Sequence, residues 1–225
     1  LTRRVRRHIH LESEVVSVKR EGNKSRVTYR QFGQEFDLEA DKVILAIPPH
    51  IATRINHDFS SDVVDSLKSY SMSKAAKVAF QSDRFWEKED NIYGGISYSD
   101  KDMTLMWYPS NDVGDDKGII VGAYNVGVDI NDTFGEKTYF DRIEMALEQG
   151  EDIHPGYRNR VYRGLSRSWL KTPFIEGGWS ISEAQERLLS QDGPYIFAGD
   201  YVSQKSGWME GAIASAQHAI TLLSN

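Results

Sequence analysis

Alternating and continuous apolar runs predict short strands near the start of the chain. Residues 12–47 contain the runs "EVVSVKR", "RVTYR" and "EFDLE", separated by turn signals in "EGNKS" and "QFG". Short runs of this kind, bounded by turn residues, predict a meander of strands. The next run, "DKVILAIPP", is almost wholly apolar, which is typical of a strand buried on both faces. Pro48 and Pro49 end its pairing, because proline has no amide hydrogen to donate to a sheet.

Two later segments have helical spacing, and strand-like runs lie between them. "SSDVVDSLKSY" predicts a short helix capped by Ser60 or Ser61. "EKTYFDRIEMALEQ" predicts an amphipathic helix with Phe140, Ile143 and Leu147 on one apolar stripe. The intervening runs "KAAKVAF", "MTLMWY" and "GIIVGAY" are separated by glycines and acidic turns, which predicts an antiparallel sheet.

The stretch "PYIFAGDYVSQKSGWMEGAIASAQHAI", residues 194–220, predicts a buried strand, a tight Gly-Asp turn and a helix. From Met209 onward the apolar residues follow helical spacing, at Ala212, Ile213, Ala216, Ile220 and Leu223. The residues between them carry little bulk, so this helix can lie close against another backbone. Its start, with bare amides and a glycine beside it, can hold an anionic group.

The two strands with apolar residues on both faces, "VILAI" and "YIFAG", lie near opposite ends of the chain. We expect them to share one sheet, with the middle region inserted as a second lobe.

Composition narrows the class of protein. The chain has 225 residues, of which 40% are hydrophobic and 27% charged, an ordinary globular balance. Its net charge of −6 argues against a general nucleic-acid binder, and "RRVRRH" at 3–8 is most simply a solvated basic face. No run approaches the roughly 20 apolar residues of a membrane span. The absence of cysteine excludes disulfides and thiolate chemistry and fits a reducing compartment. With no export signal visible, a cytoplasmic location is expected.

The common catalytic motifs are missing. The six histidines form no HExxH pair, so a metal site is not expected. The sequence has no GxSxG elbow, no GxxxxGK[ST] loop and no GxGxxG after a strand. By itself, this absence favours a binding module or a partial enzyme.

Five segments nevertheless resemble the FAD-dependent amine oxidase family, which includes monoamine, polyamine and L-amino-acid oxidases. Residues 194–220 resemble the family's C-terminal flavin-binding segment, and residues 14–49 its strand meander. "AAKVAFQSDRFWEKED" is similar to the strand with the active-site lysine, and "EGGWS" to the segment beside the flavin ring. "MWYPSNDVGDDKGIIVGAYNVGVD" is most similar to the L-amino-acid oxidase branch. Together the five cover nearly the whole chain in the family's order.

This resemblance implies an α/β (α+β) fragment. Residues 1–55 and 176–225 would form part of a Rossmann-like FAD-binding domain, and residues 56–175 an inserted antiparallel-sheet substrate-binding domain. Family members carry an N-terminal Rossmann unit with a glycine-rich loop, and this chain begins after it. The chain thus resembles the C-terminal half to two-thirds of such an enzyme, with a missing N-terminal FAD-binding segment or chain as its partner.

The resemblance also implies FAD-binding positions. Asp200, after Gly199, matches the acidic residue that binds the ribityl hydroxyls, although an Asp in a strand-ending turn is the simpler interpretation. Backbone amides of Gly207, Trp208 and Met209 would face the flavin at the helix start. The remaining implied cofactor contacts are Val15, Trp169, Gly178 and Ala212. Val15 also fits an ordinary strand valine, and Trp169 fits plain packing.

The resemblance further implies substrate positions. Trp208 and Trp179 would flank the amine as two aromatic walls, although either also fits a packed tryptophan. Tyr124 would bind the substrate carboxylate together with an arginine from the missing segment. Lys77 is the candidate for the lysine that holds a water against the flavin. Lys74 is the alternative, and a solvent-facing strand lysine is the simplest interpretation of either.

The implied reaction is the oxidation of an amine or L-amino acid by hydride transfer to FAD, with O2 as the final oxidant and H2O2 as a product. The isolated chain is expected to be inactive. Two alternatives stay open: a flavin-free fragment that needs an N-terminal partner chain, and a binding module that has lost the chemistry. The resemblance also leaves a homodimer open.

Overall fold

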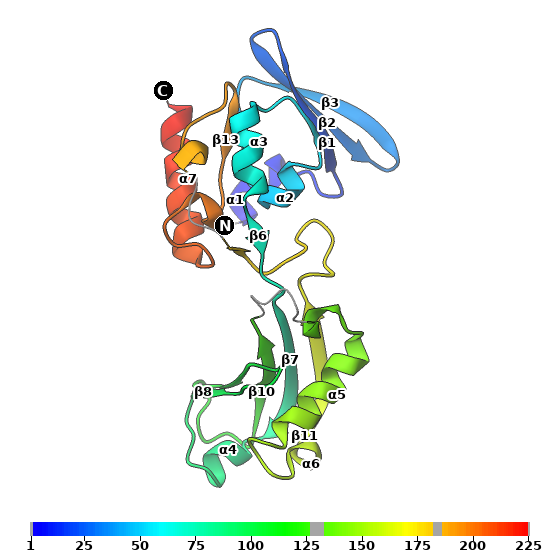
Figure 1. Cartoon of the computed structure of the whole chain (residues 1–225), viewed down its shortest axis with the longest axis vertical. Coiled ribbons are helices and arrows are strands. Elements are labelled where there is room, and N and C mark those ends of the chain that lie inside the picture. Colours follow the sequence, from blue (N-terminus) through cyan, green and yellow to red (C-terminus); the bar gives the residue numbers. More distant parts are fainter. Residues whose placement is uncertain (1, 127–132, 182–185, 225) are drawn as a thin grey trace. The chain divides into compact units, whose positions relative to one another are not determined.

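The computed structural model describes residues 2–126, 133–181 and 186–224, and the chain divides into two compact units. Unit 1 comprises residues 1–71 and 180–225, and unit 2 comprises residues 72–179 (Figure 1). The boundaries differ from the expected ones, because residues 56–71 belong to unit 1 and residues 176–179 to unit 2. The segments β6 (Ser71–Met72) and β12 (Ser180–Ile181) lie where the chain passes from one unit to the other. The roles assigned to the two parts stay predictions.

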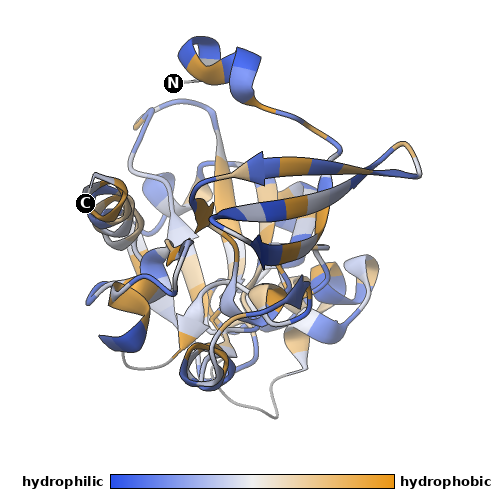
Figure 2. Cartoon of the chain, turned by 90° about the horizontal axis from the view of Figure 1, so that it is seen from above, coloured by the Kyte–Doolittle hydropathy of each residue, from blue (hydrophilic) through white to orange (hydrophobic). Residues whose placement is uncertain are grey.

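The N-terminal meander of unit 1 forms as predicted. The strands β1 (Glu14–Glu21), β2 (Lys24–Gln31) and β3 (Gln34–Ala40) pair antiparallel, and β5 (Asn56–His57) adds to β1 in parallel. Hydrophobic and hydrophilic residues alternate along these strands (Figure 2). This alternation suits a sheet with one face on the core and one in water.

The strands from opposite ends of the sequence do share one sheet, as predicted. β4 (Val43–Leu45) and β13 (Tyr195–Phe197) pair in parallel, with Ile44 opposite Ile196. All three residues of β13 are buried. The expectation that both strands are buried on both faces is wrong for β4, because Ile44 is 38% exposed. Among the described residues these two strands form a sheet by themselves, so one side of β4 has no strand beside it.

Short helices complete unit 1. They are α1 (Thr2–Val5), η1 (Arg6–His8), α2 (Pro49–Ala52), α3 (Ser61–Lys68), η3 (Glu186–Leu189), η4 (Asp200–Val202) and the longer α7 (Met209–Leu223). The core of the unit packs Val63 and Leu67 of α3 against Tyr195 and Phe197 of β13. Ser60 occupies the N-cap position of α3, but its side chain makes no capping hydrogen bond. The Ser60 hydroxyl instead accepts a hydrogen bond from Arg187.

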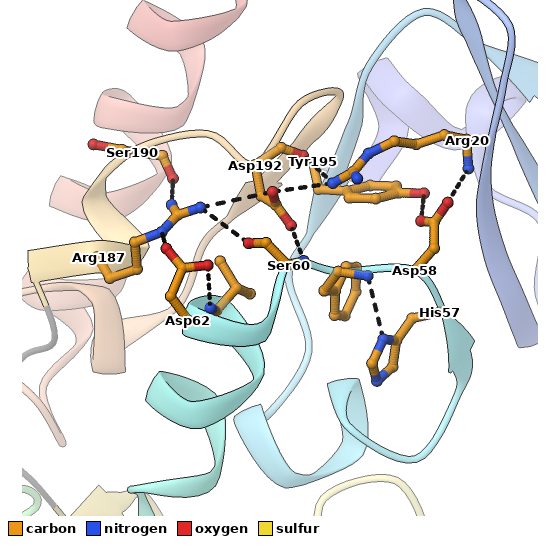
Figure 3. A network of polar contacts seen from close by, with 11 residues as sticks. Arg20, His57, Asp58, Ser60, Asp62, Arg187, Ser190, Asp192 and Tyr195 are labelled. Carbon is orange, nitrogen blue, oxygen red and sulfur yellow. Dashed lines mark hydrogen bonds and ion pairs between the residues drawn. The ribbon is translucent and has the colours of Figure 1, made fainter.

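A network of charged groups joins three segments of unit 1 (Figure 3). The buried carboxylate of Asp192 accepts the Ser60 amide at 2.9 Å and pairs with Arg20 at 3.0 Å and Arg187 at 3.6 Å. Arg187 also pairs with Asp62 on α3. Burying an unpaired carboxylate is strongly unfavourable, whereas the donors around Asp192 compensate its charge. Because these donors come from other segments, Asp192 fixes the turn that leads into β13.

A second carboxylate extends this network to the β13 strand. Asp58 accepts the Tyr195 hydroxyl at 2.6 Å and the Arg20 amide at 2.8 Å. Burial disfavours the charge on Asp58, but these hydrogen bonds outweigh it and lower the pKa of the carboxyl. Burial and the bond to Asp58 raise the pKa of the Tyr195 phenol, so Tyr195 acts as the donor.

The apolar spacing of the C-terminal helix α7 predicts that its large apolar residues are buried, but the structure buries a different face. Its buried residues are Gly211, Ser215 and Ala219, a row of small side chains that allows a close backbone approach. The large apolar residues point outward, with Ile213 59% and Ile220 60% exposed. An exposed stripe of large apolar residues on a helix marks a surface that a further protein segment can cover.

Unit 2 is built on the predicted antiparallel sheet. Its strand order is β11 (Val161–Ser168), β7 (Ala76–Asp83), β10 (Lys117–Asn125), β9 (Leu105–Tyr108) and β8 (Gly95–Tyr98). The helical segments are α4 (Phe85–Lys88), η2 (Phe134–Glu136), α5 (Tyr139–Gly150) and α6 (Tyr157–Arg160). Helix α5 runs along β11 (Figure 1).

The two faces of this sheet differ. Along β7, Ala76, Val78 and Phe80 are buried, whereas Lys77 and Ala79 on the opposite face are only partly buried. We call the side with Lys77 the open face. Helix α5 packs its Ala146 into the core cluster that contains Phe80. The apolar stripe predicted for α5 is wrong at Phe140, whose side chain is 74% exposed. The buried residues of the helix are Arg142, Ala146 and Gly150.

Gly122 provides a test of packing in unit 2. It lies at an irregularity in β10, and a Cβ there would overlap the Tyr157 hydroxyl and approach the Phe80 ring to 2.8 Å. Gly122→Ala should destabilise the protein by about 1–3 kcal/mol, as overpacking of a core does. Urea unfolding followed by tryptophan fluorescence measures the change.

Tyr157→Phe is the matched partner variant, because the Tyr157 hydroxyl is buried and has no hydrogen-bond partner among the described residues. Alone it should be neutral or stabilising, since no bond is lost. Combined with Gly122→Ala it should recover part of the lost stability. Strict additivity of the two changes would show that the hydroxyl is not the obstacle.

His154 predicts a pH dependence. Its Nδ1 lies 3.1 Å from the Asp90 carboxylate and its Nε2 2.7 Å from the Tyr108 hydroxyl, so the partners assign a proton to Nδ1. Burial lowers the pKa of His154 from 6.5, although Asp90 opposes the shift. The unfolded chain therefore takes up a proton at a higher pH than the folded one. The contribution of His154 to stability is complete above pH 6.5 and is lost as the pH falls from there toward the lower folded pKa.

Denaturant unfolding at pH 7.5 and pH 5.5 tests this dependence. The free energy of unfolding of the wild type should fall more between the two pH values than that of His154→Gln, which cannot take up the proton. An equal fall in both proteins would contradict a role for His154.

Candidate functional site

The end of β13 forms a tight turn that only glycine fits. A Cβ on Gly199 would overlap the Tyr201 ring, and the Gly199 amide donates to the Ser215 hydroxyl at 3.0 Å. The turn is thereby fixed to α7, and Asp200 follows at the start of η4. Oδ2 of Asp200 accepts the Gly207 amide at 2.6 Å and lies 3.4 Å from the Ser206 hydroxyl. No described residue donates to Oδ1, which leaves one carboxylate oxygen as an acceptor for a ligand hydroxyl.

A hollow of about 440 Å³ lies at the N-terminus of α7. It is lined by Gln204, Lys205, Ser206, Trp208 and Glu210. Trp208 is the N-cap residue of α7, and Met209 begins the helix. Both side chains are exposed. A helix N-terminus, a lysine and an available carboxylate oxygen suit a group that carries both hydroxyls and negative charge, as the ribityl phosphate part of FAD does.

The other proposed cofactor positions of unit 1 have simpler surroundings. Gly207 has a φ of +81°, a left-handed conformation that favours glycine. Ala212 lies exposed in the first turn of α7, and its amide donates to the Trp208 carbonyl. Val15 is partly exposed beside an irregularity in the β1–β2 pairing. A cofactor role for these three residues stays a prediction.

In unit 2, three predicted residues come together on the open face of the sheet. Tyr124 on β10 is the cross-strand partner of Lys77 on β7. The Lys77 ammonium lies 4.2 Å from the centre of the Tyr124 ring and 5.8 Å from that of Trp169. A cation over aromatic faces is attracted by the negative charge of the rings. Burial raises the pKa of the Tyr124 phenol, so its hydroxyl stays a donor.

The structure favours Lys77 over Lys74 as the lysine available to a ligand. Lys74 pairs with Glu136 at 2.9 Å. Lys77 makes no ion pair with a described residue, and its contacts are the two aromatic rings. Lys77 therefore carries a positive charge that no described carboxylate compensates.

Gly178 and Trp179 lie at the end of unit 2. The Gly178 amide donates to the Ser73 carbonyl at 2.8 Å, and the Ser73 amide donates to the Trp179 carbonyl at 2.9 Å. A Cβ on Gly178 would lie 2.5 Å from Cβ of Ala75, so the two backbones approach closely here. Trp179 is half-buried. Its role as an aromatic wall stays a prediction.

Sequence reasoning missed two residues near Lys77. The Trp107 ring, on β9, lies 6.2 Å from the Tyr124 ring and extends the aromatic group. Arg167, on β11, is the cross-strand partner of Lys77. Side chains two residues apart along a strand point to the same face, so Arg167, two residues before Trp169, could have been assigned to the face of Trp169. Placing Arg167 near Lys77 requires in addition that β11 is known to pair with β7.

The described residues contain no group of three His, Asp or Glu side chains that could hold a metal ion. Among the helices of the described segments, none combines the length and apolar character needed to cross a membrane. The last residues of the segment that resembles the L-amino-acid oxidase branch, 127–129, lie outside the described residues.

The chain is similar to known proteins along nearly its whole length. Residues 1–220 match the model of the family described as "Flavin containing amine oxidoreductase". The chain is 26% identical to the flavin-dependent L-tryptophan oxidase RebO of Lentzea aerocolonigenes, over 98% of this chain and 49% of that protein. It is 24% identical to an L-amino-acid oxidase of Echis ocellatus, over 95% of this chain and 44% of that protein.

Solved structures show the same fold. Putrescine oxidase bound to putrescine superposes with a TM-score of 0.76 at 20% identity, over 95% of this chain and 49% of that chain. Cyclohexylamine oxidase from Brevibacterium oxydans IH-35A gives a TM-score of 0.79 at 17% identity, over 97% and 49%. The chain spans about half the length of the relatives it matches. Since the family model matches nearly all of its residues, the chain belongs to the flavin containing amine oxidoreductase family.

Proposed function

We propose that this chain forms the C-terminal part of an FAD-dependent oxidase of L-amino acids or amines. The observation that carries the proposal is the turn at Gly199 and Asp200, whose carboxylate keeps one available oxygen and accepts the Gly207 amide just before the α7 N-terminus. The Lys77 cluster in unit 2 supports it independently. FAD, when bound, supplies the redox chemistry, taking a hydride from the carbon that bears the amine and passing two electrons to O2 to give H2O2.

The residues of unit 1 would hold the cofactor. Asp200 accepts hydrogen bonds from ribityl hydroxyls, and the amides at the start of α7 face the electron-rich part of the group. Trp208, exposed at the same helix start, is free to contact a bound ligand. Val15, Trp169 and Gly178 remain further proposed contacts.

The residues of unit 2 would orient the substrate. The Tyr124 phenol donates a hydrogen bond to a substrate carboxylate without adding a second charge. The aromatic surface of Trp179 excludes water from the reacting carbon. Lys77 holds a water by donating to it, as an ammonium with no carboxylate partner can. The L-amino-acid side of the proposal is supported by the two relatives named above.

The chain would need a further segment to complete the cofactor site. It lacks the glycine-rich loop that cradles the pyrophosphate in dinucleotide-binding folds. The outward-facing side chains Ile213 and Ile220 on α7, and Ile44 on β4, offer an apolar surface to such a segment. We propose that the complementary half of the family covers this surface and that the isolated chain is inactive.

We expect the isolated chain to retain little or no FAD, because the most charged part of the cofactor would lack its cradle. Gel filtration after incubation with FAD, with absorbance read at the flavin bands, tests this. Co-expression with a glycine-rich N-terminal half should give a flavin-loaded protein. A stoichiometric flavin spectrum from the isolated chain would refute the prediction.

The same assay separates a cofactor role of Asp200 from general stability. In the flavin-loaded complex, Asp200→Ala should lower the bound flavin, because the ribityl hydroxyls lose an acceptor. Asp152→Ala removes an exposed carboxylate in unit 2 and should not change it. Equal flavin content in both variants would remove Asp200 from the proposed site.

The substrate role of Tyr124 predicts a selective loss of activity. In the flavin-loaded complex, Tyr124→Phe removes one hydroxyl and keeps the ring over Lys77. A hydrogen bond to a charged group is worth about 1.5–3 kcal/mol, so kcat/KM for phenylalanine should fall about tenfold to a hundredfold. The rate with phenethylamine, which has no carboxylate, should be unchanged.

Steady-state peroxide release with the two substrates measures this difference. Tyr98→Phe, which changes an exposed tyrosine on β8, is the control and should affect neither substrate. Equal losses on both substrates would show that Tyr124 serves packing alone.

A further inference from the structure

A second hollow, of about 290 Å³, lies at the end of the unit 2 sheet where β7 ends and β10 begins. Gln81 and Lys117, from these two strands, are among its lining residues. Gln81 stands four residues along β7 from Lys77, which is about 13 Å in an extended strand. The lining residues that the structure describes include neither Lys77 nor Tyr124, so this hollow is distinct from the residues proposed to orient the substrate.

A buried arginine lines this hollow. The side chain of Arg84 is 1% exposed and pairs with the Glu87 carboxylate, which accepts Nε at 2.6 Å and Nη2 at 2.5 Å. Nη2 also donates to the Asn111 carbonyl at 2.9 Å. Buried N–H groups nearly always have an acceptor, but Nη1 has none among the described residues. Nη1 is therefore a donor available to a ligand in the hollow.

The same ion pair fixes one wall of the hollow, the loop between β9 and β10. Glu87 accepts the Gly114 amide at 2.9 Å, and the Arg84 amide donates to the Asp116 carbonyl at 3.2 Å. Gly118, on β10, leaves room for the guanidinium, because a Cβ there would lie 2.9 Å from Nη1. A wall held in this way is preorganised, so a ligand can bind without first ordering the loop.

Two opposite charges line the hollow without pairing. Lys117 makes no ion pair with a described residue, including its cross-strand partner Asp83, and its ammonium lies 5.5 Å from the centre of the Tyr162 ring. Oδ2 of Asp112 accepts the Asn111 side-chain amide at 2.6 Å, and no described residue donates to Oδ1. Lys117 and Asp112 thus border the same space, and no ion pair joins them in the described part of the chain.

We propose that this hollow binds a small zwitterion, a molecule with a carboxylate and an ammonium group a few bonds apart, such as an α-amino acid. The carboxylate would accept from Nη1 of Arg84 and from Lys117, and the ammonium would donate to Asp112. Glu87 balances the charge of Arg84, so the remaining charges of the hollow are the one cation and the one carboxylate. A ligand with a single charge is repelled by one of them, whereas a zwitterion matches both.

The rest of the lining limits the size of the ligand. Pro109 and Ile119 provide an apolar part, and the volume lies at the lower end of the range of about 300–1,000 Å³ for ligand pockets, which favours a small side chain. Every residue of the site belongs to unit 2. The proposal therefore stands or falls independently of the flavin experiments.

Thermal unfolding of the chain, followed by tryptophan fluorescence, tests the site. Four of the five tryptophans lie in unit 2, so the signal reports mainly on that unit. L-Alanine is the probe; propionate lacks its ammonium group and ethylammonium lacks its carboxylate, all at neutral pH and constant ionic strength. L-Alanine at about five times its Kd should raise the Tm by about 2–4 °C in a saturable manner, and the two analogues at the same concentration should raise it less.

Two variants change the charges of the hollow one at a time. Lys117→Gln should remove most of the L-alanine shift, because the carboxylate loses its cation. Asp112→Asn should reduce the L-alanine shift and increase the propionate shift, because the charge that repels propionate is gone. Asparagine suits this position, since Asp112 has a φ of +52°, in the left-handed region that Asn also adopts. A change of stability alone would not exchange the two ligands in this way.

Lys101→Gln and Asp152→Asn are the matched controls. Each removes the same charge from an exposed position of unit 2 outside the described lining, and each should keep the full L-alanine shift. An L-alanine shift of wild-type size in Lys117→Gln or Asp112→Asn, or an equal shift with propionate in the wild type, would overturn the proposal. The absence of a saturable shift up to about 100 mM L-alanine, about a hundred times a millimolar Kd, would overturn it as well.

Discussion

The parallel pairing of β4 with β13 is the constraint on which the architecture depends. It joins residues 43–45 to residues 195–197, so everything between must leave the sheet and return to it. Bringing together two strands so far apart in the chain costs chain entropy, and this cost rises only weakly with the length of the intervening loop. The intervening chain offsets that loss by folding on its own core, around Phe80 and Trp86. The pairing also delivers the Gly199–Asp200 turn to the start of α7, where a cofactor would be held.

The charged network around Asp192 secures this pairing at its weakest point. A two-stranded sheet of three residues per strand has few hydrogen bonds of its own. Asp192 and Asp58 tie the entry of β13 to α3 and β1 through Arg20, Arg187 and Ser60 (Figure 3). Because the carboxylates are held by several donors each, the turn before β13 has one arrangement, and that fixes where Asp200 lies.

The two faces of the five-stranded sheet of unit 2 carry different kinds of side chain. The buried face carries the aromatic core and tolerates no added volume at Gly122. The open face carries cations and aromatic rings that stabilise one another only in part, since Lys77 and Arg167 repel and no described carboxylate intervenes.

The sequence by itself determined the local elements, the shared sheet of β4 and β13, the inserted antiparallel sheet and the membership of the family. These follow from short-range patterns: alternation in β1–β3, continuous apolar residues in β13, and the Gly-Asp turn before a helix of small residues. It also offers Lys77, with Lys74 as the alternative, and Tyr124 as candidates, because their segments resemble the family's, and their roles stay predictions.

Only the tertiary structure shows that Lys74 pairs with Glu136, which lies far from it in the chain. The tertiary structure also decided which face of α7 is buried. The spacing of apolar residues predicts a buried apolar stripe, but the helix instead buries the small residues Gly211 and Ala219, and the large apolar residues face outward. Arg167 stood in the sequence as one exposed arginine among many. Strand register placed it opposite Lys77, and register is set by pairing across the sheet rather than by any local pattern.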